Sequence, residues 1–179
     1  MINTPTIHAK ETPGVKVAQA ATSVALTNAF TTRTRRNPKR RRMIGITVFI
    51  PMAPTAGVEF IRRDFLEAGA GEEIKALLGG DADVVLSDMA ANATGHRPTD
   101  HLKIMALAEA AADFAREVLA PGGVFLCKVL QGGTEATLLA GLKRDFGHVK
   151  HVKPAASRPE SAELYLLATG FRGMRQPMR

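Results

Sequence analysis

Short apolar runs alternate with longer amphipathic stretches along the chain from residue 43 onward. The apolar runs predict strands, and a period near 3.6 residues in the stretches between them predicts helices. The predicted strands cover residues 44–50, 58–61, 83–87, 124–130, 148–153 and 163–169, and the predicted helices cover 72–80, 100–119 and 134–146. This alternation indicates an open α/β sheet with right-handed crossovers, in which we expect the last two strands to be antiparallel.

The longest predicted helix, 100–119, has an apolar face broad enough to lie on a sheet. Thr99 precedes the helix and is a candidate N-cap. The main apolar stripe comprises Leu102, Met105, Ala108, Ala112, Ala115 and Leu119. We therefore expect this helix to pack directly on the sheet.

Three charged residues stand in otherwise apolar strands of the C-terminal half. Asp88 ends the run DVVLSD, Lys128 interrupts VFLCKVL, and Glu163 opens ELYLLATGF. Burying a charge is costly unless the charge is paired or serves catalysis. By itself Lys128 could be an ordinary strand lysine whose ammonium reaches the sheet edge. With two carboxylates on neighbouring strands, it becomes a candidate to take a proton from a hydroxyl group.

Two carboxylates follow the ends of predicted strands. Asp64 comes soon after strand 58–61, and Asp88 comes directly after strand 83–87. In open α/β sheets ligands bind at the carboxyl ends of the strands. We therefore expect both side chains at the ligand edge, although either could instead cap a turn or a helix.

Composition excludes several classes of protein. The chain has 179 residues, which suits one domain, and no apolar stretch approaches the ~20 residues of a membrane span. The single cysteine, Cys127, excludes an internal disulfide and is expected to be a small buried side chain. His148 and His151 would face opposite sides of a strand, so we expect no metal site. We expect no membrane partner and a cytoplasmic location.

The positive charge of the chain is concentrated near its start. Residues 1–45 hold nine Lys and Arg and one Glu, a net charge of +8, against +7 for the whole chain. Most of these residues lie in the run TRTRRNPKRRR at 32–42. The run could bind RNA phosphates or could be a solvated tail without a partner. Because residues 1–43 show no convincing period, we expect them to be mostly disordered.

Four sequence blocks resemble the FtsJ-like ribosomal RNA 2'-O-methyltransferases of the large-subunit methyltransferase E type. The blocks are IPMAPTAGVEFIRRDF (50–65), SDMAANATG (87–95), LAPGGVFLCKVLQG (119–132) and KPAASRPESAELYLLATGF (153–171). The resemblance covers residues 50–172 and leaves the N-terminal part unmatched. It implies a Rossmann-like α/β sheet with helices on both faces. The implied domain spans residues 44–172, after a leader at 1–43 and before a tail at 173–179.

The resemblance implies methyl transfer from S-adenosylmethionine to the ribose 2'-hydroxyl of a uridine in large-subunit ribosomal RNA. Asp88, Lys128 and Glu163 match the last three members of the family's Lys-Asp-Lys-Glu tetrad and are the expected catalytic residues. Asp64 matches a carboxylate near the adenine, and Asp88 is also expected beside the donor. Lys128 could act as a base only with a pKa well below ~10.4. Burial lowers this pKa and the two carboxylates raise it.

The N-terminal part departs from the family pattern. No glycine-rich loop of the GxPGG type occurs before residue 50, Val48 stands where the family has an acidic residue, and none of Lys10, Lys16 and Lys39 stands in the context of the first tetrad lysine. A frame-shifted or rearranged gene start, a genuine basic RNA-binding tail and an unrecognised substitute strand are all compatible with this pattern.

Loss of the family's first strand would leave a gap in the middle of the sheet. Either strand 44–50 pairs directly with strand 83–87, or SVALTNAF (23–30) fills the gap, or the sheet stays open at that point. Function has matching alternatives. The chain is expected to be the methyltransferase, possibly defective; otherwise it is a non-catalytic RNA-binding remnant or a methyltransferase for a substrate other than RNA.

Overall fold

A seven-stranded sheet forms the centre of the computed structural model, which describes residues 27–32, 42–47, 58–89, 91, 94–131 and 136–173. The strand order is β3-β2-β1-β4-β5-β7-β6. The strands are β1 (Thr27–Thr32), β2 (Arg42–Thr47), β3 (Val58–Arg62), β4 (Ala82–Ser87), β5 (Leu119–Leu130), β6 (Phe146–Val152) and β7 (Glu163–Phe171). The helices are α1 (Ala70–Leu78), α2 (Arg97–Val118) and α3 (Ala136–Asp145). The predicted α/β class is confirmed.

Two strands run against the direction of the others. The pairs β2–β3 and β4–β5 are parallel, whereas β1 is antiparallel to both β2 and β4. At the other end of the sheet β7 is antiparallel to β5 and to β6, as predicted for the closing pair. The carboxyl ends of β3, β4 and β5 therefore share one edge of the sheet.

The strand β1 occupies the gap expected between the second and fourth strands. Phe30 pairs with Ile44 on one side and with Val85 on the other. Of the three arrangements considered, the second is therefore observed, with the strand displaced to residues 27–32. The sequence predicts no regular structure there, because TNAFTT has no clear alternation. Its placement is dictated by two neighbouring strands whose backbone groups need partners.

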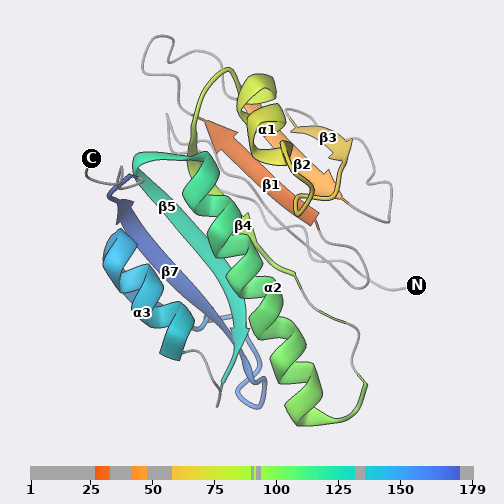
Figure 1. The fold of residues 1–179 in the computed structure, drawn as a ribbon. Coiled ribbons are helices and arrows are strands. Elements are labelled where there is room, and N and C mark those ends of the chain that lie inside the picture. Colours follow the sequence, from red (N-terminus) through yellow and green to blue (C-terminus); the bar gives the residue numbers. More distant parts are fainter. Residues whose placement is uncertain are drawn as a thin grey trace.

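The described helices form one layer. α2 packs against β4 and β5 and contacts both α1 and α3, and Figure 1 shows it running along the sheet. Under this layer lie fully buried side chains such as Phe125, Cys127 and Leu166. The helices expected on the opposite face are not among the described residues. That face carries the alternate residues of each strand, including Lys128 and Tyr165.

The start of α2 differs from the prediction. The N-cap is His96 rather than Thr99, and Pro98 lies in the first turn. Proline suits this position because the first N–H groups of a helix have no partner within it. The hydroxyl Oγ1 of Thr99 instead lies 2.8 Å from His96 Nδ1. The helix therefore starts three residues earlier than its apolar period suggests.

Candidate active site

Asp88, Lys128 and Glu163 meet on the face opposite the helix layer. Lys128 Nζ lies 2.8 Å from Asp88 Oδ1 and 3.3 Å from Glu163 Oε1. Strand register explains the meeting, because Lys128 pairs with Tyr165 and Leu130 with Glu163, so the side chains alternate onto a common face. The structure thus brings together the three residues that the sequence singled out as a group.

Solvent exposure falls from the carboxylates to the lysine. The side chain of Lys128 is 10% exposed, that of Asp88 31% and that of Glu163 50%. Burial lowers the pKa of Lys128, but the hydrogen bond and charge of Asp88, followed by the charge of Glu163, outweigh burial and raise this pKa above its ordinary value. In the absence of other ligands Lys128 is therefore an ammonium ion at neutral pH.

Tyr165 is a fourth member of the cluster that the sequence did not assign. Its hydroxyl donates a hydrogen bond of 2.9 Å to Asp88 Oδ1, the same oxygen that Lys128 contacts. Burial, followed by the charge of Asp88, raises the pKa of Tyr165 to about 12. The available signal was the two-residue spacing from Glu163, which places both side chains on one face of a strand.

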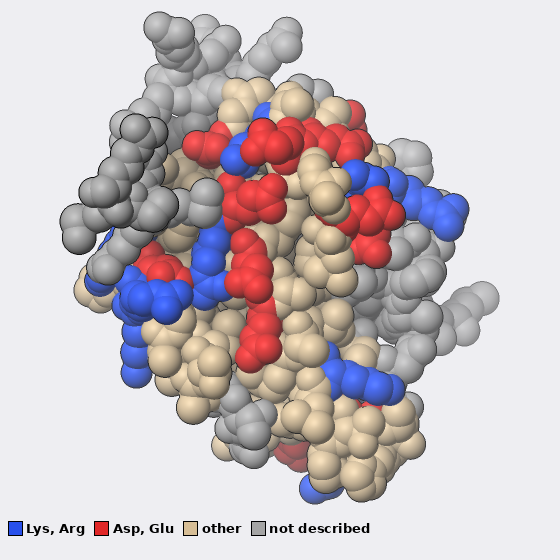
Figure 2. Space-filling view, in the orientation of Figure 1, with Lys and Arg blue, Asp and Glu red and all other residues tan. Residues whose placement is uncertain are grey.

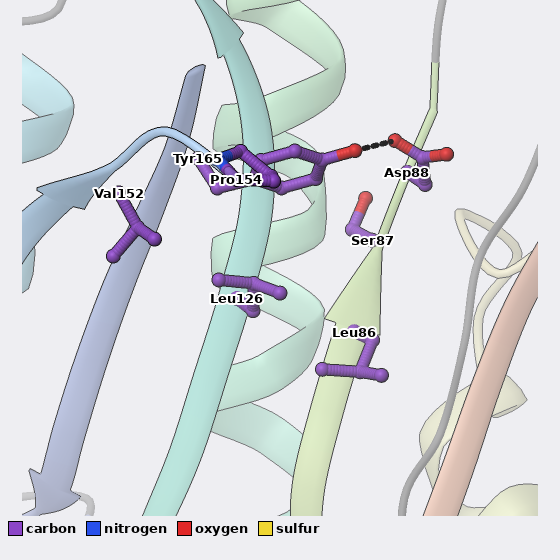
Figure 3. Close-up of a pocket in the computed structure, with 7 residues that line it drawn as sticks. All are labelled: Leu86, Ser87, Asp88, Leu126, Val152, Pro154 and Tyr165. Atoms are coloured by element: carbon purple, nitrogen blue, oxygen red, sulfur yellow. Dashed lines mark hydrogen bonds between the residues drawn. The ribbon is translucent and has the colours of Figure 1, made fainter. Parts of the chain in front are cut away.

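A pocket adjoins this cluster on the face of the sheet opposite the described helices. It has a cavity volume of about 240 Å³ and is lined by Leu86, Ser87, Asp88, Leu126, Val152, Pro154 and Tyr165. Figure 3 shows the Tyr165 hydroxyl pointing at Asp88 across the pocket, with α2 behind the strands. An apolar floor with polar groups at one end is the usual composition of a small-molecule or nucleotide site.

Asp64 lies at the same edge of the sheet but apart from the cluster. It follows β3, which is three positions from β4 in the strand order. At ~4.8 Å per strand the separation is about 14 Å. Its Oδ1 accepts a hydrogen bond of 2.9 Å from the Leu66 N–H. Asp64 and Asp88 could therefore contact the two ends of an elongated ligand, but not the same atom.

The loop from β4 to α2 is fixed at its far end by Asp100. The Asp100 carboxylate accepts hydrogen bonds from Thr94 N at 2.7 Å, Thr94 Oγ1 at 2.6 Å and Gly95 N at 3.2 Å. The hydrogen bonds from Thr94 hold the pKa of Asp100 below its ordinary value. Because the loop begins at Asp88, both of its ends are held by side-chain contacts.

One stripe on the outer surface of α2 is acidic. Glu109, Asp113 and Glu117 are exposed and lie four residues apart, so they form one stripe along α2. Figure 2 shows this acidic column over the helix. Lys143 and Arg144 are exposed on α3 in the same layer, so repulsion of a polyanion is confined to this stripe.

Two classes of site are not found in the part of the chain that the structure describes. There, no group of three or more His, Cys, Asp or Glu side chains could hold a metal ion. No described helix is long and apolar enough to span a membrane. Val48 and the three upstream lysines lie outside the described residues, so the predictions that concern them stay predictions.

Comparison with known proteins places the chain among methyltransferases. The family model described as FtsJ-like methyltransferase matches residues 20–171, beginning thirty residues before the first of the four blocks. Curated relatives named "Ribosomal RNA large subunit methyltransferase E" are 66% identical over 124 residues in Xanthobacter autotrophicus and 65% identical over 124 residues in Azorhizobium caulinodans. These matches cover 69% of this chain, which spans about half the length of each relative, 49% and 52%.

A solved structure agrees with the fold. The crystal structure of a protein described as a ribosomal RNA methyltransferase from Plasmodium falciparum matches with a TM-score of 0.63 and 28% identity. The match covers 73% of this chain and 72% of the other. The sheet and its helix layer are therefore those of a known architecture.

Proposed function

The chain belongs to the FtsJ-like methyltransferase family, and from that premise we propose that its site serves S-adenosylmethionine-dependent 2'-O-methylation of a uridine ribose in large-subunit ribosomal RNA. The observation that carries the proposal is the position of Lys128 between Asp88 and Glu163 at the ligand edge. The relatives are named as ribosomal RNA methyltransferases, which supports an RNA substrate. A cytoplasmic location and a ribosomal particle as partner belong to the same proposal.

The chemistry requires a group that removes a proton from a ribose hydroxyl. Lys128 is placed to receive it, and Asp88 and Glu163 hold the ammonium in a fixed position. The raised pKa of Lys128 means that the lysine starts protonated and needs a change of surroundings to act as a base. Bound S-adenosylmethionine supplies the methyl group and a positive charge that opposes protonation of nearby amines.

The residues of this chain fit the donor only in part. Asp64 and Asp88 lie at the carboxyl edge, about 14 Å apart by strand spacing, which suits an elongated nucleoside–amino acid conjugate. Between β2 and β4, however, the described strand is antiparallel and presents its beginning, Thr27, at that edge. A turn that leads from a strand at this position into a helix, the kind of turn that commonly binds such ligands, is absent from the described residues. The part of the site that fits best is therefore the one that acts on the acceptor hydroxyl, which consists of Lys128, Asp88 and Glu163.

The position of the acidic stripe supports an RNA substrate on the face of the sheet opposite the described helices. Glu109, Asp113 and Glu117 disfavour phosphates along that part of α2. On the other face the pocket lies next to the tetrad residues, and His148 and Lys150 are exposed on β6 nearby. An RNA strand approaching this face would bring its ribose to Lys128 without crossing the acidic surface.

Methyl transfer to RNA tests the proposal. We would incubate large-subunit particles lacking ribose methylation with labelled S-adenosylmethionine and either this chain or a chimera in which the N-terminal region of the Xanthobacter relative replaces residues 1–49. Label on a uridine 2'-oxygen with the chimera is the expected result. RNA binding without any transfer by the chimera would favour the RNA-binding remnant instead. Transfer to a substrate other than RNA would contradict the assigned substrate.

A further inference from the structure

One oxygen atom of Asp88 has two donors. Lys128 Nζ lies 2.8 Å from Asp88 Oδ1, and the Tyr165 hydroxyl donates to the same oxygen at 2.9 Å. Asp88 follows the last residue of β4, so its backbone is outside the strand ladder. The Asp88 side chain is also 31% exposed, so it is accessible to solvent. Its direction therefore depends on the side chains that it contacts.

Of the two donors, Tyr165 is the more rigid. It is the third residue of β7, in register with Lys128 on β5 and Val152 on β6, so its backbone is held from both sides. A tyrosine side chain has two rotatable bonds before its ring, whereas a lysine ammonium sits at the end of a flexible four-carbon stem. We propose that Tyr165 is a positioning residue, whose hydroxyl holds the Asp88 carboxylate in the direction that pairs with Lys128.

The other charged groups near the pair come from the neighbouring strands. Glu163 on β7 contacts Lys128 at 3.3 Å. Lys153, just after β6, donates instead to the backbone oxygens of Pro159 and Ser161, both at 3.0 Å. Because the pKa of Tyr165 is raised to about 12, its hydroxyl keeps its proton and stays a donor throughout the neutral range.

Removal of this hydroxyl has a defined consequence. In Tyr165→Phe the ring still fills its place, but Asp88 Oδ1 loses one of its two donors and the direction of the carboxylate is less constrained. The attraction between Asp88 and Lys128 then weakens, because a Coulomb interaction falls with distance and with solvent screening. Asp88 raises the pKa of Lys128, so this pKa is expected to fall when the carboxylate turns away.

The inference rests on the proposed function for its meaning in catalysis, but its test uses neither donor nor RNA. We would follow the Lys128 ammonium by NMR titration in the unaltered chain, in Tyr165→Phe and in a matched control, Thr169→Val. Thr169 lies four residues along β7 on the same face, ~13 Å from Tyr165, so its hydroxyl is remote from Asp88. A lower Lys128 pKa in Tyr165→Phe alone is the expected result. An unchanged or higher pKa overturns the inference.

A second measurement tests the proposal even if Tyr165→Phe fails to fold. Tyr165 is the single tyrosine and the chain has no tryptophan, so the ultraviolet signal of phenol ionisation reports this residue alone. Asp88→Asn removes the charge that raises the pKa of Tyr165, so ionisation should move to lower pH. Ionisation at an unchanged pH would show that the hydroxyl does not engage Asp88 and would overturn the proposal. Failed methyl transfer with a positive result here would count against the proposed function alone.

Discussion

Along its strand order the sheet has two sides, β4-β5-β7-β6 and β3-β2-β1, and they are built by different means. On one side β4, β5 and β7 hold Asp88, Lys128, Glu163 and Tyr165 within hydrogen-bonding distance, with a pocket beside them. On the other side β3 and β2 join the rest of the sheet through a reversed strand, β1. A sheet needs only backbone hydrogen bonds to close a gap, so either strand direction serves. A ligand site needs particular side chains and turns, so the reversal affects function more than fold.

The largest effect is expected on the side that holds the tetrad residues. In the chimera described above, Lys128→Met should reduce methyl transfer by ~100- to 10,000-fold, because a general base is removed. Single-turnover transfer to ribosomal particles measures this loss, and donor affinity should be unchanged.

Glu163→Gln should reduce methyl transfer much less, since Glu163 is half exposed and lies 3.3 Å from Lys128. Lys143→Met, which alters an exposed lysine on α3 in the helix layer, is the control. Near-normal transfer by Lys128→Met would contradict the role of Lys128.

The next effect concerns the side that contains β1. We expect this chain to bind S-adenosylmethionine at least ~100-fold more weakly than the chimera, because several hydrogen bonds of ~1 kcal/mol each have no counterpart among the described residues beside the reversed strand. Titration calorimetry on both proteins gives the ratio. Micromolar affinity in the unaltered chain would show that the reversed strand supports the donor after all.

A proline in β1 tests whether this strand joins the two sides. Ala29 pairs with Gly45 and with Leu86, so its neighbours lie on both sides. Ala29→Pro removes a ladder donor and should lower the free energy of unfolding by about 1–3 kcal/mol, the cost of an unsatisfied buried polar group. Urea denaturation measures the change. Ala29→Val keeps the N–H and should be tolerated. Equal stability of the two variants would place residue 29 outside the sheet.

The smallest effect concerns the anchoring of α3 and β6. Asp145 accepts hydrogen bonds from Arg116 Nε at 2.7 Å and Arg144 Nε at 2.9 Å. Burial opposes ionisation, but these arginines outweigh it and hold the pKa of Asp145 below its ordinary value. The stabilisation is therefore full above the unfolded pKa, near 3.8, and is lost as pH falls through the lower folded pKa.

Asp145→Asn should accordingly lower the free energy of unfolding by about 1 kcal/mol at pH 7. The difference from the unaltered chain should shrink as pH drops below about 4. Asp113→Asn, which alters an exposed partner of Arg116, should change stability little. Denaturation curves at several pH values distinguish the two variants. A pH-independent difference for Asp145→Asn would show that its charge has no part in the effect.

The sequence predicted the C-terminal side of the molecule well because its signals are local. Apolar runs and amphipathic periods locate β4, β7 and α2 to within three residues, and Lys128 is conspicuous because a charge interrupts a buried strand. The end of β5 is also predicted, but β5 begins at Leu119, five residues before the predicted start. Tyr165 was not assigned, because its hydrogen bond to Asp88 depends on the register that places Tyr165 on β7 opposite Lys128 on β5. The start of α2 was misplaced because a first-turn proline and the Thr99–His96 contact depend on loop geometry.

The N-terminal side was harder to predict for a physical reason. The residues TNAFTT have no pattern that specifies a strand, and their position follows from backbone pairing with β2 and β4. Tertiary context commonly overrides weak local preference in strands. The direction of β1 in particular cannot be derived from its composition. The expected leader, domain and tail boundaries stay predictions.

The reversal of β1 also fixes where the arginine-rich connection leaves and re-enters the sheet. Thr32 and Arg42 are paired partners, whereas Asn28, near the other end of β1, pairs with Ser87 beside Asp88. The connection between Thr32 and Arg42 therefore starts and finishes one strand length, about 17 Å, from the ligand edge. An RNA that contacts the chain both where β2 begins, at Arg42, and at Lys128 would extend along the sheet, with different nucleotides at its two ends. For such a substrate, a minimal oligonucleotide would bind through one end only, and RNA length would become a determinant of affinity.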